Sequence, residues 1–197
     1  MRPGEVLNAS RVGAIAALGR AHVDAYARPR VAILSTGNEI VDPGHPLQPG
    51  QIYDINRFTV AAVVAEHGGT PVSHRTAADT IPDLERALDE CLEADVVVFS
   101  GGTSVGERDL ILDALSNRGE VLFHGISVKP GKPTAFGLVK GKPFFGMPGY
   151  PSSCLLNTHI LLVPALRAIA RLPALERRTI TLPLARRVVS AKDRHQF

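Results

Sequence analysis

The sequence has 197 residues, enough for one medium-sized domain with flanking segments, and its 45% hydrophobic content excludes a disordered chain. The net charge of +3 is too small to favour nucleic acid as a partner. Cys91 and Cys154 have no metal-ligand spacing, so neither a disulfide framework nor a zinc site is indicated, and we expect a reducing cytoplasm. The stretch MRPGEVLNAS lacks the apolar run that a signal peptide needs, and Pro164 and Arg167 interrupt the longest apolar stretch, so we expect no membrane span.

The first half of the chain alternates between helical and strand-like patterns. A short helix capped by Asn8 or Ser10 is predicted first, followed by a short strand over 21–26. The stretch 42–50, rich in proline and glycine, predicts a surface loop. The regular segments of the main domain are a strand over 30–34, a helix over 55–67, a strand over 70–76, a helix over 79–92 and a strand over 95–99. This alternation predicts right-handed βαβ units and a parallel sheet.

The second half departs from that alternation. A helix over 109–117 and an extended segment over 120–128 precede two strand-like runs, 134–139 and 143–147, which flank the turn Lys140-Gly141-Lys142. This hairpin predicts an antiparallel edge strand. The later segments are an apolar helix over 154–172, in which Pro164 forces a kink or a restart, and strand-like runs at 178–182 and 187–189. The predicted fold class is therefore α/β with a mostly parallel sheet and one antiparallel edge strand.

The stretch SGGTSVGERD, residues 100–109, follows a buried strand and indicates an anion site. Glycines without Cβ let a ligand approach the backbone, and hydroxyls lie beside free amides: Gly101, Gly102, Thr103 and Ser104. Asp109 would repel a phosphate there unless a cation such as Mg²⁺ lay between them. The structural alternative, a tight turn with an acidic first helical turn, stays open.

Three further loops, 35–54, 129–133 and 146–153, are expected at the same end of the sheet as 100–109. The prolines of KPGKP stiffen the backbone that carries Lys129 and Lys132, and pre-fixed ammonium groups bind an oxyanion at a lower ordering cost. Each feature also has a structural explanation: solvated lysines, a surface acid at Glu39, and helix caps at Asp54, Asp79, Ser152 and Ser153. Together, the loops indicate a phosphate-bearing ligand with a divalent cation.

These motifs, in this order, resemble those of the molybdenum cofactor biosynthesis domain, and most closely the molybdopterin molybdenumtransferase family. The matching stretches are STGNEI (35–40), QIYDIN (51–56), SGGTSVGERD (100–109), KPGKP (129–133) and PGYPSS (148–153). The resemblance implies a three-layer α/β/α sandwich that binds adenylylated molybdopterin. It also implies hydrolysis of that nucleotide with Mg²⁺ and insertion of molybdate into the dithiolene.

The resemblance also implies roles for individual residues. Glu39, Asp79 and Asp109 would be catalytic and serve the cation and the adenylate, with Glu39 and Asp109 as metal ligands. Asp54 and Asn56 would shape the pterin pocket. Molybdate would be held by Lys129, Lys132 and Ser153. Further substrate contacts are expected from Thr36, Gly37, Gly101, Gly102, Thr103, Ser104, Pro148 and Gly149. The family commonly has Asp at the position of Asn38 and Asn at that of Tyr150.

Family members carry additional domains, so we expect this chain to be a fragment of a larger protein. Residues 1–28 would link to a missing N-terminal region, 29–173 would form the molybdopterin-binding domain, and 174–197 would begin a missing C-terminal β domain. A cytoplasmic homodimer is expected, without nucleic acid or membrane as a partner. Two other functions stay open: molybdopterin adenylyltransferase, whose glycine motif also ends in Arg-Asp like Arg108-Asp109, and a non-catalytic module that binds pterin or oligomerises.

Overall fold

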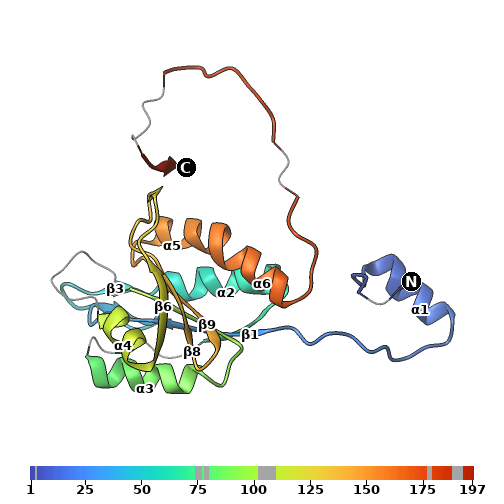
Figure 1. Ribbon diagram of the computed structural model, residues 1–197, viewed down its shortest axis with the longest axis horizontal. Coiled ribbons are helices and arrows are strands. Elements are labelled where there is room, and N and C mark those ends of the chain that lie inside the picture. The colour runs from blue at the N-terminus through green and yellow to red at the C-terminus, as the bar shows by residue number, and fades with distance from the viewer. Residues whose placement is uncertain (3, 74–76, 78–79, 102–109, 177–178, 188–192) are drawn as a thin grey trace.

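The computed structural model describes residues 1–197 except 3, 74–76, 78–79, 102–109, 177–178 and 188–192. The chain enters through an isolated helix, α1 (Ala9–Ala17), which stands apart from the main body in Figure 1 and buries none of its residues. The side chain of Asn8 accepts the Arg11 amide, so the predicted cap is confirmed. The predicted strand over 21–26 is wrong, because this exposed segment has no neighbouring strand with which to pair.

A six-stranded sheet with the order β4-β1-β5-β9-β8-β6 forms the centre of the main body. Its strands are β1 (Arg30–Ser35), β4 (Thr70–Ser73), β5 (Val96–Ser100), β6 (Gly119–His124), β8 (Ala135–Val139) and β9 (Lys142–Met147). The first four in spatial order are parallel, whereas β8 is antiparallel to β9 and to the outermost strand β6. The mostly parallel sheet with antiparallel pairing at one edge is thus confirmed.

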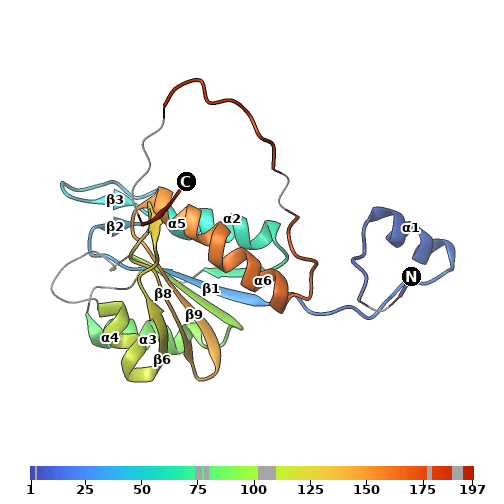
Figure 2. The ribbon, with the colours of Figure 1, turned by 45° about the horizontal axis from the view of Figure 1, so that its top comes forward.

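Helices cover both faces of this sheet, as Figure 2 shows. The helices α3 (Ile81–Cys91) and α4 (Leu110–Arg118) pack on one face, and α2 (Asn56–Glu66), α5 (Pro151–Asn157) and α6 (Val163–Ile169) pack on the other. Successive side chains of a strand point to opposite faces. Accordingly, Ala32 and Leu34 join the α3 and α4 core, while Val31 and Ile33 join the α2 and α5 core. The predicted α/β/α sandwich follows from this two-sided burial.

A π-helical segment, η1 (Thr158–Leu162), joins α5 to α6. Pro164 lies in the first turn of α6 and cannot donate a backbone hydrogen bond, so the predicted interruption is confirmed. The combined helix Pro151–Ile169, with a mean hydropathy of 1.3, is long and apolar enough to cross a membrane by length and composition. Leu162, Val163 and Leu166 of this helix are buried within the domain, and 39% of the apolar segment is buried in all.

Two short ladders lie outside the main sheet. The strand β2 (Ile40–Val41) pairs with β3 (Ile52–Tyr53), and β7 (Val128–Lys129) pairs with β10 (His195–Gln196) near the end of the chain. The predicted strand over 178–182 is wrong for its described part, because residues 179–182 extend away from the sheet without a partner (Figure 1). Most of 187–189, also predicted as strand, lies outside the described residues.

The two cysteines provide the first testable prediction. Burial raises the pKa of the Cys91 and Cys154 thiols to about 12, from an ordinary value of 9.0. The thiols therefore stay protonated in the folded chain at a pH where the unfolded chain ionises them. The free energy of unfolding should fall as the pH rises from about 9 towards 12, by up to about 1.4 kcal/mol per pH unit for each thiol.

Denaturant titrations at pH 8 and pH 10 would measure this loss. The variant Cys91→Ala/Cys154→Ala is the control, because it has no thiol to ionise and should lose less stability over the same interval. An equal loss in the variant and in the unsubstituted chain would contradict the prediction.

Candidate functional site

The register of the sheet brings four loops to one edge. Ser35, Ser100 and Met147 form one row across β1, β5 and β9, at the carboxyl ends of these parallel strands. Ala135 begins the antiparallel strand β8 and lies opposite Gly146 of β9. The loops after β1, β5 and β9 and the loop before β8 therefore leave the sheet on the same side. For the described residues of these loops, the prediction that they share one end of the sheet is confirmed, and residues 102–109 lie outside the described residues.

The loops after β1 and β9 both contact Gly101, the first residue after β5. Its amide donates to the Met147 carbonyl at 3.3 Å, and the Thr36 amide donates to the Ser100 carbonyl at 2.9 Å. Gly101 has a φ of +114°, and an ideal Cβ there would lie 2.8 Å from Thr36 Oγ1 and still closer to the Thr36 carbonyl oxygen. An ideal Cβ at Gly149 would lie 3.5 Å from Gly101 Cα. Thr36 and Gly101 are thus packed tightly, and Gly149 contacts Gly101 at an ordinary van der Waals distance, so the three residues form one continuous floor.

A buried polar network lies next to this floor. The Ser35 hydroxyl donates to Asp54 Oδ1 at 2.9 Å, and the Ser100 hydroxyl, 3.2 Å from that of Ser35, is left to donate to it. Asp54 Oδ1 also accepts the Arg57 amide at 3.1 Å, and Arg57 Nε lies 3.2 Å from Asp54 Oδ2. The Arg57 guanidinium makes a second ion pair with Asp42. Asp54 therefore caps the first turn of α2 and compensates a buried cation.

Asn56 connects α2 to the loop after β9. Its side-chain amide donates to the Gly149 carbonyl at 2.8 Å. Within the described part of the chain, the buried atoms Asn56 Oδ1 and Thr36 Oγ1 have no hydrogen-bond partner. Buried polar atoms without a partner are costly, which makes these two atoms candidates for bonds to a ligand.

The acidic residues predicted to bind the cation are only partly described. Glu39 is exposed, and its carboxylate lies over the turn at Gly37, since an ideal Cβ on that glycine would be 2.8 Å from Glu39 Oε2. Asp79 and Asp109 lie outside the described residues, as do Gly102, Thr103 and Ser104. Among the residues that the structure describes, no group of three or more His, Cys, Asp or Glu side chains could hold a metal ion. These residues alone do not complete a Mg²⁺ site.

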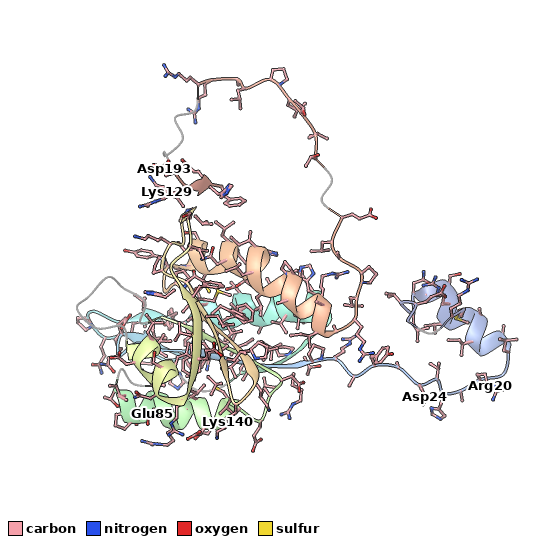
Figure 3. The ribbon with its side chains drawn as sticks, viewed as in Figure 1. Arg20, Asp24, Glu85, Lys129, Lys140 and Asp193 are labelled. Carbon is pink, nitrogen blue, oxygen red and sulfur yellow. The ribbon has the colours of Figure 1, made fainter. Side chains whose placement is uncertain are left out.

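The lysine loop, residues 129–133, lies at the same edge of the sheet. Lys129 and Lys132 are exposed, whereas Gly131 between them is buried. Figure 3 shows Lys129 at the tip of this loop, near the end of the chain. The amide of Phe197, which follows β10, donates to the Lys129 carbonyl at 3.2 Å. Ser153 is buried in the first turn of α5, which begins at Pro151, three residues before the predicted start at 154, and Pro148 leads from β9 into this helix.

Several polar residues of this edge were not predicted as site residues: Ser35, Ser100, Arg57, Thr134 and Asn157. For three of them, the residue type and its position in the sequence indicated a polar role. Ser35 and Ser100 are hydroxyl residues at the carboxyl ends of buried strands, and Asn157 is a single amide within an apolar helix. Their partners depend on the pairing of strands and on helix placement, which spacing along the chain does not reveal.

Comparison with known families and structures agrees with this arrangement. Residues 32–168 match the family model described as "Probable molybdopterin binding domain". The chain belongs to this molybdopterin binding domain family.

Two curated relatives illustrate the extent of the similarity. Molybdopterin molybdenumtransferase 2 of Mycobacterium tuberculosis is 35% identical over 201 residues, which cover 98% of this chain and 50% of the relative. Molybdopterin molybdenumtransferase of Haemophilus influenzae is 42% identical over 151 residues, or 76% of this chain and 37% of the relative. The chain thus spans about half the length of the first of these relatives.

Solved structures share the fold. The molybdopterin biosynthesis moea protein from Pyrococcus horikosii aligns with a TM-score of 0.78 and 43% identity, over 87% of this chain and 43% of that one. The molybdopterin biosynthesis enzyme MoaB from Thermus aligns with a TM-score of 0.57 at 18% identity, over 74% of this chain and 99% of that one. At that identity the second similarity concerns the fold alone.

Proposed function

We propose that this chain is part of a molybdopterin molybdenumtransferase, an enzyme of molybdenum cofactor biosynthesis. The reaction would insert molybdate into adenylylated molybdopterin, depend on Mg²⁺ and release AMP. The observation that carries the proposal is the convergence of the Thr36, Gly101, Gly149 and lysine loops at one edge of the sheet, in a chain of the molybdopterin binding domain family.

The pterin nucleotide would bind at the floor formed by Thr36, Gly101 and Gly149. Thr36 occupies the Cβ position of Gly101, and Gly101 lies against Gly149, so these glycines let the loops pack together. A ligand lying beside them would bond Thr36 Oγ1 and Asn56 Oδ1. A hydroxyl and an amide oxygen can pair with the polar edge of a pterin ring. Asn56 is held in place by its bond to the Gly149 carbonyl, so this contact would need little rearrangement.

The lysine loop and Ser153 would hold molybdate. Two ammonium groups and a hydroxyl suit a tetrahedral oxyanion, since charge-assisted hydrogen bonds are stronger than neutral ones. The metal's sulfur ligands would come from the dithiolene of the substrate, so the lack of exposed cysteine does not oppose this function.

Glu39 and Asp109 would hold Mg²⁺, which would neutralise phosphate charge when bound. Of these two, Glu39 belongs to the described residues. We further propose a homodimer in a reducing cytoplasm, where Cys91 and Cys154 stay free thiols, with neither membrane nor nucleic acid as a partner.

Replacement of Lys129 tests the proposal. In the full-length protein, Lys129→Ala should lower molybdate-dependent release of AMP by about 10²-fold or more, because a charged contact to the oxyanion is lost. Release of AMP from adenylylated molybdopterin, followed with and without molybdate, is the measurement.

Lys140→Ala is the matched control, since Lys140 is an exposed lysine in the β8–β9 turn, at the opposite end of the sheet from Lys129 (Figure 3). It should retain the activity of the unsubstituted protein. A full-length protein that never releases AMP would refute the transferase. Consumption of ATP with pterin that is not yet adenylylated would favour molybdopterin adenylyltransferase, and ligand binding without turnover would favour a non-catalytic module.

A further inference from the structure

Behind the lysine loop lies a buried polar cluster formed by Gly131, Thr134 and Asn157. The Asn157 side-chain amide donates to the Gly131 carbonyl at 2.8 Å and lies 2.6 Å from Thr134 Oγ1. The Thr134 hydroxyl donates to the same Gly131 carbonyl at 3.0 Å. Thr134 and Asn157 are both fully buried, at 0% exposure. The three residues form a closed set of hydrogen bonds between the loop and the last residue of α5.

The fit of Gly131 against Asn157 leaves no room for a side chain. An ideal Cβ on Gly131 would lie 2.5 Å from Asn157 Nδ2 and 2.8 Å from Asn157 Oδ1, and the φ of Gly131 is +110°. The glycine therefore faces α5, while Lys129 and Lys132 on either side of it are exposed. The contact with Asn157 thus fixes which side of the loop faces the helix.

Backbone hydrogen bonds within the loop complete this support. The Ile126 and Thr134 amides both donate to the Lys132 carbonyl, at 3.0 and 2.9 Å, and the Gly125 amide donates to the Thr134 carbonyl at 2.8 Å. The backbone of Lys132 is thereby tied to the segment that Asn157 anchors. The position of the Lys132 Cα, from which the side chain and its ammonium group extend, is therefore fixed.

The cluster is more polar than packing requires. Asn157 Oδ1 is buried and, among the described residues, has no hydrogen-bond partner. A buried amide with one orphan acceptor is a poor choice for stability alone, because an apolar side chain of the same size avoids that cost. The η1 segment begins directly after Asn157, and π-helical turns are frequent at functional sites.

From this geometry we infer that Asn157 is a positioning residue for oxyanion binding: it orients the loop that carries Lys129 and Lys132. The inference rests on the proposed function, in which these lysines bind molybdate. Positioning lowers the ordering cost that each long side chain adds to binding. Without it, the two ammonium groups would bind the same anion less tightly.

The experiment measures Asn157→Leu and Thr134→Val in the full-length protein. Both variants keep side-chain size and remove hydrogen bonds to the loop. We expect the KM for molybdate to rise about tenfold, with the KM for adenylylated molybdopterin and the kcat at saturating molybdate changed less than about twofold. Thr134→Ser keeps the hydroxyl and should restore a KM near that of the unsubstituted protein.

Amide hydrogen exchange provides a readout that needs no turnover. The Gly125, Ile126 and Thr134 amides should exchange faster in both variants that lose the bonds, and at the original rate in Thr134→Ser. Should Asn157→Leu fail to fold, Thr134→Val and Thr134→Ser still decide the question.

The outcomes separate the inference from the proposed function. If Lys129→Ala and Lys132→Ala leave molybdate dependence intact, the proposed function fails, and the inference fails with it. If the lysine variants lose activity while Thr134→Val changes neither the KM for molybdate nor the exchange rates, only the positioning role is overturned. An equal rise of both KM values would likewise assign Asn157 and Thr134 a general structural role.

Discussion

Arg57→Met is expected to lower the free energy of unfolding by about 3–5 kcal/mol, the usual cost of removing one partner from a buried ion pair. The side chains of Arg57 and Asp54 are only 8% and 1% exposed, and the ion pair joins Nε to Oδ2 at 3.2 Å. Methionine fills much of the arginine's volume but leaves the Asp54 carboxylate buried without its cation. Urea or guanidinium titration of both proteins measures the difference.

The control for this variant is Arg118→Met. Arg118 pairs with Glu85 and Asp89 at 3.4 and 3.0 Å, but all three side chains are partly exposed. Such pairs contribute about 0–1 kcal/mol, so the control should change stability little. The double variant Asp54→Asn/Arg57→Met should recover part of the loss, because the buried carboxylate is removed with its cation and the remaining partner, Asp42, is 42% exposed. Equal effects at Arg57 and Arg118 would mean that the Arg57 pair is not a buried one.

Gly101→Ala is expected to destabilise the domain by at least about 3 kcal/mol, through backbone strain together with overpacking. The strain arises from the φ of +114°, and the overpacking from the collision of the new Cβ with the Thr36 carbonyl. The same collision would push apart the loops after β1 and β5. Under the proposed function, pterin binding, measured by calorimetry below the melting temperature, should therefore weaken together with stability.

Gly44→Ala separates these two causes. Gly44 has a φ of +96°, but no atom lies within 4 Å of its ideal Cβ. The substitution should thus show the strain alone, about 1–2 kcal/mol. If Gly101→Ala is no more destabilising than Gly44→Ala, the close approach to Thr36 does not exist in solution.

The regular elements could be predicted from the sequence because local patterns determine them. The Lys140 turn joins two antiparallel strands, and Pro164 follows the interruption between α5 and α6, both as expected. Thr80 caps α3, which lies within the predicted helix over 79–92. The two failed strands, at 21–26 and 179–182, have extended patterns but no neighbouring strand. Strand formation depends on a partner, and local composition does not reveal whether one is present.

The site was predictable in outline for a similar reason. Parallel strands place their following loops at one edge, so the location of Thr36, Gly101 and Gly149 follows from topology. Two contacts depend on the tertiary packing of the helices: the ion pair of Asp54 with Arg57 and the hydrogen bond from Asn157 to the Gly131 carbonyl. These contacts could not be read from spacing along the chain. The roles of Asp79 and Asp109, outside the described residues, stay predictions.

The division of the core into two faces has a practical consequence. Cys91 belongs to the cluster beneath α3 and α4, and Cys154 to the cluster beneath α2 and α5. Cys91 ends α3 and Cys154 lies in α5, and both side chains are fully buried, so a thiol reagent can reach either sulfur only when the helix that carries it separates from its neighbours. In two single-cysteine variants, the rate of thiol modification would therefore report the transient opening of each helical layer separately.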